Sequence, residues 1–134
     1  MIATRTTSLA ETLIAAGCFL LIAPVAEAAS PSCSAEKLQG RYVFSGQGTN
    51  LHDGTFEFDG EGNVLGKQTS IRKVVLRETL RGTYALDRDC KGTMTLEGQP
   101  GGTAHWDLFV SSDGKKGRMI RIDPGVTGVR PFEQ

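Results

Sequence analysis

Short segments in which apolar and polar residues alternate, separated by glycine-rich turns, follow one another through the sequence after Cys33. In the longest segment, residues 74–86, the even positions include Val74, Leu76, Leu80, Tyr84 and Leu86, whereas Arg77, Arg81 and Thr83 fall on odd ones. Alternation with a period of two is typical of β-strands that bury one face. This region shows no sustained periodicity of the kind that an amphipathic helix requires. The sequence therefore predicts an all-β fold.

The spacing of the segments predicts how the strands are connected. Seven or eight segments recur at intervals of about ten residues with hairpin turns between them, which is typical of an antiparallel meander. Closing such a sheet removes the two exposed edges that invite association. We therefore expect a small antiparallel up-and-down β-barrel of about seven or eight strands rather than a sandwich. The strands are expected at residues 42–44 and 56–58, from residue 64, and at residues 74–86, 93–96, 104–110, 118–122 and 129–132. The one helical turn expected is at residues 34–37, capped by Ser34.

The N-terminal residues have the pattern of a cleaved signal peptide. Arg5 precedes an apolar run at residues 13–25, and Ala26 and Ala28 form a small-x-small cleavage signature. We expect residues 1–28 to be removed and residues 29–134 to form one β-barrel domain. The apolar run is short for a membrane span and polar residues follow it, so we expect no stable span after cleavage. The alternative is a retained signal anchor. The predicted location is periplasmic or extracellular.

Export changes how the cysteines are interpreted. Beyond the leader only Cys33 and Cys90 remain, and an even pair in an oxidising compartment is most simply one disulfide. Closing a loop of this length is worth roughly 4 kcal/mol by the loop-entropy estimate. The alternative is a redox pair, but the chain has no C-x-x-C arrangement.

Charge and size exclude several classes of protein. The chain of 134 residues has 15 basic and 15 acidic side chains, which argues against a nucleic-acid partner. We expect no metal, because the two histidines are far apart in sequence and the cysteines are better used as a disulfide. We also expect no cofactor, because residues 46–48 and 98–102 lack the further residues that dinucleotide and phosphate loops require.

Five segments together carry a family resemblance: LQGRYVF (38–44), GTFEFDGEGNV (54–64), LRGTYAL (80–86), DCKGTMTL (89–96) and DPG (123–125). They resemble small exported bacterial proteins of mostly unassigned function, whose architecture is similar to the allene oxide cyclase barrel and, more distantly, to dirigent and lipocalin-like (calycin) barrels. The resemblance implies a barrel with an apolar cavity for a flexible small molecule, and a family that includes oligomers. It transfers no catalytic residue to this chain.

Glu78 is the first candidate for a site residue. It lies on the even face of residues 74–86, so an unbroken strand would direct its carboxyl group into the barrel. There it could act as an acid or as a hydrogen-bond anchor for a ligand. The alternatives are a bulge near Arg77 that turns Glu78 to solvent, or an internal pairing with an arginine.

Other candidates carry weaker arguments. The hydroxyl groups of Tyr42 and Tyr84 could reach the same cavity as ligand-binding groups, although core tyrosines near a barrel mouth are common. His105 and Asp107 share a strand face. We expect them to form a solvated pair, because the large apolar side chain of Trp106, on the opposite face, is expected to be buried in the interior. His52 is expected on a loop.

The leading hypothesis is an exported β-barrel that binds a small apolar or amphipathic ligand or serves as an envelope interaction module, without being an enzyme. One alternative is a cavity catalyst of the cyclase or isomerase type that uses Glu78 with a tyrosine. Another is a structural barrel filled by its own side chains, namely Phe44, Phe56, Phe58, Trp106 and Leu108. Outward apolar residues such as Val43 and Val75 would suit a homo-oligomer.

Overall fold

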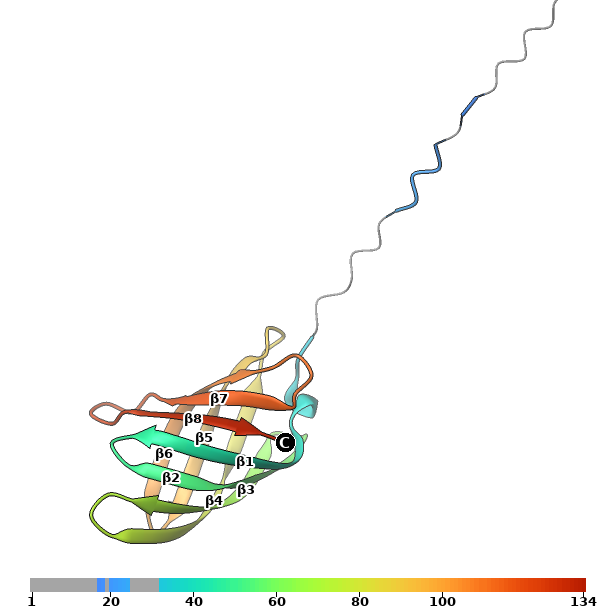
Figure 1. The fold of residues 1–134 in the computed structure, drawn as a ribbon. Coiled ribbons are helices and arrows are strands. Elements are labelled where there is room, and N and C mark those ends of the chain that lie inside the picture. The colour runs from blue at the N-terminus through green and yellow to red at the C-terminus, as the bar shows by residue number, and fades with distance from the viewer. Residues whose placement is uncertain (1–16, 19, 25–31) are drawn as a thin grey trace, which may run out of the picture.

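The computed structural model describes residues 17–18, 20–24 and 32–134. Eight strands close into an antiparallel up-and-down barrel in which each strand pairs with the next and β8 pairs with β1 (Figure 1). The elements are η1 (Ala35–Lys37, a 3-10 turn), β1 (Gln39–Gly48), β2 (Leu51–Asp59), β3 (Asn63–Ile71), β4 (Val75–Leu86), β5 (Lys91–Gln99), β6 (Gly102–Val110), β7 (Lys116–Arg121) and β8 (Gly128–Glu133). The predicted fold class is therefore confirmed. The predicted leader, residues 1–28, lies largely outside the described residues.

Alternation along each strand separates the barrel interior from its surface. In β4, Glu78, Leu80 and Tyr84 are buried, whereas Thr79, Arg81 and Thr83 are exposed. The register between β3 and β4 is continuous, with Gln68 opposite Glu78 and Ser70 opposite Leu76. An unbroken register leaves no bulge that would turn Glu78 to solvent.

Aromatic rings fill one end of the barrel, which we call the closed end. Phe44 and Phe56 stack with ring centroids 4.2 Å apart. Phe58 packs edge-to-face against Tyr42 and Tyr84 at centroid distances of 5.2 and 5.1 Å. Edge-to-face and stacked rings add to the stabilisation that burial provides. The closed end is therefore a solid core.

The segment before β1 covers the closed end (Figure 1). The disulfide between Cys33 and Cys90, predicted from the cysteine count, ties this segment to the β4–β5 turn. The Cys33 N–H also donates to the Arg88 carbonyl at 3.2 Å. The short helical turn is present as η1, but Ser34 makes no side-chain capping bond, so its predicted role as a cap is wrong.

None of the helical segments in the described ranges is long and apolar enough to cross a membrane. The outward apolar residues singled out in the sequence do face solvent, with Val43 57% and Val75 54% exposed. Exposed single apolar side chains are ordinary on protein surfaces. Only a contiguous group of them therefore calls for an explanation.

Candidate ligand-binding site at the open end of the barrel

The end opposite the disulfide, which we call the open end, carries the turns β1–β2, β3–β4, β5–β6 and β7–β8 (left in Figure 1). Below these turns the barrel interior contains a cavity of about 170 Å³. Its lining includes Asn50, His52, Gln68, Ser70, Leu76, Glu78, Leu80, Leu96, Trp106, Arg121, Val126 and Arg130. The interior is therefore solid at one end and hollow at the other, so the hypothesis of a barrel filled throughout by its own side chains holds only for the closed end.

A chain of hydrogen bonds crosses the cavity wall from β4 to β8. The Nε2 group of Gln68 donates to Oε2 of Glu78 at 2.6 Å, and Nη1 of Arg130 donates to Oε1 of Gln68 at 2.9 Å. The Ser70 hydroxyl also donates to Oε2 of Glu78, at 3.3 Å. Glu78 is 7% exposed and Arg130 4% exposed. A buried carboxylate and a buried guanidinium are thus linked through an amide rather than by direct contact.

The β5–β6 turn packs on the other oxygen of Glu78. A β-carbon on Gly101 would overlap Oε1 of Glu78, and one on Gly98 would lie 2.9 Å from the same atom. Side chains at these positions would occupy the space that the carboxylate uses. The two glycines therefore allow Glu78 to lie against the turn with its side chain directed into the barrel.

Arg130 lies over the indole ring of Trp106, with Cζ 4.4 Å from the ring centroid. The Cζ atom of Arg121 lies 5.4 Å from the centroid of the same ring, but Arg121 forms an ion pair with Asp123. Burial, together with the positive charge of Arg121, lowers the pKa of Arg130 to about 10. At neutral pH Arg130 is consequently a buried cation, stabilised by the face of an indole.

Three side-chain atoms of the described residues are buried and have no hydrogen-bond partner: Oδ1 of Asn50, Nδ1 of His52 and Nε1 of Trp106. All three residues line the cavity at the open end. Because an unpaired buried polar atom costs about 1–3 kcal/mol, such atoms usually meet water or a ligand. Their convergence gives this one cavity three polar atoms that a polar ligand could contact.

His52 lies in β2 and lines the cavity, so the expectation that it occupies a loop is wrong. Burial, followed by the charges of Arg130 and Arg121, lowers the pKa of His52 to about 4. The imidazole is therefore neutral near pH 7 and offers one donor and one acceptor. Its strand was missed because the glycine at position 54 and the polar residues around it conceal the alternation.

The structure does not bring Tyr42 and Tyr84 to this cavity. The Tyr42 hydroxyl donates to the Gly114 carbonyl at 2.5 Å, and the Tyr84 hydroxyl donates to the carbonyls of Ala35 and Leu38 at 2.8 and 3.1 Å. Burial raises the pKa of both phenols. Both tyrosines therefore hold the segments that cover the closed end, remote from Glu78.

The expected pairing of His105 with Asp107 is replaced by a different one. Nδ1 of His105 lies 2.7 Å from Oδ1 of Asp123, in the β7–β8 connection, and half of the His105 side chain is exposed. Hydrogen bonds from His105 and Arg121 keep the pKa of Asp123 well below its usual range. This cluster lies at the surface and fixes the connection rather than facing the cavity.

Metal ligation has no support among the described residues, since no three His, Cys, Asp or Glu side chains cluster.

Sequence reasoning did not identify four residues that complete the cavity: Gln68, Ser70, Trp106 and Arg130. The alternation along the strands could have identified them. Gln68 and Ser70 are an even number of positions from the inward Val64 of β3, and Arg130 is two positions from the inward Phe132 of β8, so these polar side chains also point inward. Polar side chains on an apolar face indicate a polar interior.

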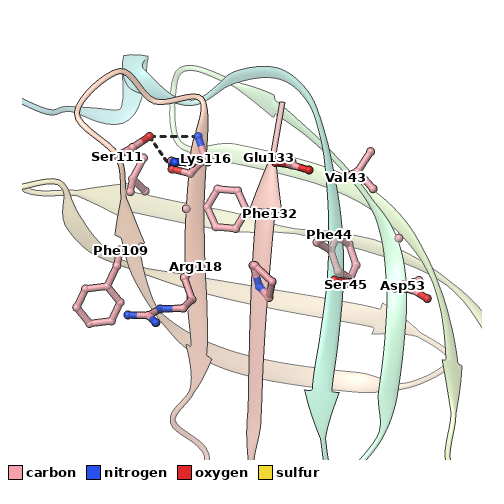
Figure 2. A pocket seen from close by; sticks show the side chains of 14 residues that line it. Val43, Phe44, Ser45, Asp53, Phe109, Ser111, Lys116, Arg118, Phe132 and Glu133 are labelled. Atoms are coloured by element: carbon pink, nitrogen blue, oxygen red, sulfur yellow. Dashed lines mark hydrogen bonds between the residues drawn. The ribbon is translucent and has the colours of Figure 1, made fainter.

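A second, larger hollow of about 660 Å³ lies on the outer surface, across β6, β7, β8, β1 and β2 (Figure 2). We call it the outer groove. Only backbone separates this groove from the core at two positions, because Gly54 and Gly117 lie directly over the rings of Phe44 and Phe132. Its lining includes Val43, Ser45, Asp53, Phe109, Lys116, Arg118, Pro131 and Glu133. The groove is more open than the cavity and carries no buried network.

Comparisons with known proteins support the architecture. No protein-family model matches the chain, and no curated protein matches it. Among solved structures, the chain is similar to a redesigned β-barrel, mFAP1, bound to DFHBI, with a TM-score of 0.61, 12% identity, and coverage of 78% of this chain and 100% of that one. It is also similar to a de novo designed fluorescence-activating β-barrel, with a TM-score of 0.59, 13% identity, and coverage of 75% of this chain and 95% of that one. These likenesses show a closed β-barrel fold and do not establish the expected relation to allene oxide cyclase barrels.

Proposed function

We propose that the protein binds a small amphipathic molecule in the cavity at the open end. One observation carries this proposal: three unpartnered buried polar atoms and a row of leucines face the same cavity of about 170 Å³. Ligand sites typically combine mostly apolar walls with a few converging polar groups. The similar mFAP1 barrel is bound to DFHBI, which agrees with a barrel interior that accepts a small molecule.

Trp106 provides a direct assay, because it is the only tryptophan in the chain. We expect hexanol, hexanoate or benzamide to change its fluorescence in a saturable titration. Leu76→Phe adds bulk to the apolar side of the cavity and replaces no member of the hydrogen-bonded network, and should weaken binding by tenfold or more. Leu65→Phe, on the outer face of β3, is the control.

Native mass spectrometry of the protein purified from its own host tests the same proposal independently. We expect an extra mass that is lost on denaturation. Protein without any such mass, together with unchanged Trp106 fluorescence for all three compounds, would contradict ligand binding.

A second function, catalysis in the same cavity, is favoured by the buried carboxylate of Glu78. A ligand held against Glu78 would meet a fixed oxygen able to exchange a proton, as a cyclase or isomerase of the allene oxide cyclase type requires. Neither tyrosine could assist, because both lie at the closed end. The test is Glu78→Gln, which should abolish conversion of a bound compound if catalysis occurs and leave it unchanged if it does not.

For the outer groove we propose a second copy of this chain as the partner. Basic Lys116 and Arg118 lie on β7, acidic Glu133 lies beside Lys116 on β8, and exposed Val43 of β1 separates Glu133 from acidic Asp53 of β2 (Figure 2). A twofold axis would place the basic residues of each copy against the acidic residues of the other. This proposal corresponds to the homo-oligomer expected from the sequence.

Sedimentation at increasing protein concentration tests this association. Val43→Glu adds a negative charge beside Glu133 and should shift the equilibrium to monomer. Leu65→Glu, equally exposed on β3 and outside the groove, should leave it unchanged. A monomer at all concentrations for the unmodified protein would refute the dimer.

We further propose that the chain is exported and cleaved after Ala28. The disulfide between Cys33 and Cys90 supports an oxidising compartment. N-terminal sequencing of the protein recovered from a periplasmic or culture fraction should begin at Ala29. Recovery of the full chain with Met1 from the cytosol would contradict export.

A further inference from the structure

Arg130 is a buried positive charge without a contacting counter-ion. Its side chain is 4% exposed, and no carboxylate of the described residues lies within 4.0 Å of it, in contrast to Arg121, which pairs with Asp123. Its one side-chain hydrogen bond among these residues is the bond from Nη1 to Gln68. A guanidinium has five N–H donors, so most of those of Arg130 have no protein acceptor. A buried charge normally has a partner, because desolvating it is expensive.

Trp106 adds a second donor of the same kind next to this charge. Its ring lies 4.4 Å beneath the Arg130 guanidinium, the residue is 2% exposed, and its Nε1 group has no acceptor. A cation with further donors available and an N–H donor without an acceptor therefore lie side by side on the wall of one cavity. An anionic oxygen would satisfy both groups.

Glu78 does not supply this oxygen. Its Oε2 atom accepts from Gln68 and Ser70, and its Oε1 atom faces Gly98 of β5 and Gly101 of the β5–β6 turn. Gln68 separates it from Arg130, to which the same amide is bonded. The network fixes the position of the guanidinium and leaves its remaining donors free.

The rest of the cavity limits the size and chemistry of an anion. A volume of 170 Å³ corresponds to about five or six liquid water molecules. Leu76, Leu80 and Leu96 form an apolar wall that an inorganic ion would leave without a partner. A short-chain or single-ring organic acid matches both halves of the site.

Resting on the proposed ligand-binding function, we propose that the cavity at the open end binds a small organic acid and that Arg130 receives its carboxylate. The planar guanidinium matches the two oxygens of a carboxylate. Trp106 Nε1 donates to the same group, and the leucines contact the hydrocarbon part. The site thereby selects charge as well as size.

Benzoate and benzamide, which have nearly the same shape and differ in charge, are the probes for this proposal. We expect the unmodified protein to bind benzoate about tenfold or more tightly than benzamide, by Trp106 fluorescence and by calorimetry. Benzoate should also shift the single indole N–H proton resonance downfield. Arg130→Met should reduce the benzoate-to-benzamide ratio to about one, and Arg130→Lys should give an intermediate ratio. Arg81→Met, which removes the same charge from the outer face of β4, should leave the ratio unchanged.

The outcomes separate this proposal from the one on which it rests. Equal binding of benzoate and benzamide would overturn the carboxylate assignment and leave ligand binding intact, as would a ratio insensitive to Arg130→Met. Binding of neither compound would overturn the assignment, and ligand binding would then be decided by the native mass spectrum. Inorganic phosphate that competes as strongly as benzoate would also overturn it, in favour of a general oxyanion site. If Arg130→Met does not fold, the carboxylate assignment is still tested on the unmodified protein, by its relative affinity for benzoate and benzamide and by the shift of the indole N–H resonance.

Discussion

Gly101 lies so close to Glu78 that a β-carbon at position 101 would overlap the carboxylate oxygen Oε1. The opposite oxygen is held by Gln68 and Ser70, so the carboxylate cannot move away without breaking those bonds. The turn and the buried acid therefore depend on each other.

Gly101→Ala should destabilise the protein by about 1–3 kcal/mol, because it displaces Glu78 from its hydrogen bonds. On a Glu78→Ala background the same substitution should cost much less, since the conflicting atoms are gone. Equilibrium denaturation of the unmodified protein, the two single variants and the double variant gives the coupling energy, which we expect to be about 1–2 kcal/mol. Additive effects would show that the two residues do not interact.

Tyr84→Phe should lower the free energy of unfolding by about 1–2 kcal/mol, because it removes a hydroxyl that donates to the Ala35 and Leu38 carbonyls. Affinity for benzoate should not change, since Tyr84 lies at the closed end. Urea denaturation and a fluorescence titration test both statements. A variant with normal stability and weakened binding would instead support the ligand-binding role expected for Tyr84 from the sequence.

Replacing both Cys33 and Cys90 by serine should destabilise the protein by roughly 2–4 kcal/mol, because the disulfide closes a loop with a sequence separation of 57. A reducing agent should lower the denaturation midpoint of the unmodified protein to that of the double variant. Midpoints that are the same with and without reductant would show that the link does not restrict the unfolded chain.

Stability should fall between about pH 6.5 and 4 because of His52. Its pKa drops from 6.5 in the unfolded chain to about 4 in the folded protein. Within this interval the unfolded state binds more protons, so acidification favours unfolding, and the stability contributed by neutral His52 is fully present only above pH 6.5. The side chain is partly exposed, which limits the effect to about 2 kcal/mol or less.

The measurement is the free energy of unfolding at pH 7 and pH 4.5 for the unmodified protein and for His52→Gln. Glutamine does not titrate, so the pH-dependent loss should be smaller in the variant. Equal losses in both proteins would assign the pH dependence to other groups.

Local patterns were enough to predict the barrel and the pairing of the cysteines. Alternation in β4 placed Glu78 on the inner face, because strand geometry alone decides which side chains point inward. The hydrogen bond between Gln68 and Arg130 could not be predicted in this way, since the residues are 62 positions apart and meet only through barrel closure. The extent of the cavity also escaped prediction, because it depends on how far the rings of Phe44 and Phe56 fill the interior.

The seam between β8 and β1 closes the barrel, and Arg130 belongs to β8. During synthesis a chain therefore lacks both the closing hydrogen bonds and this guanidinium until β8 has left the ribosome. The sheet stays open until then. Closure of the barrel and the arrival of Arg130 in the cavity wall are the same event.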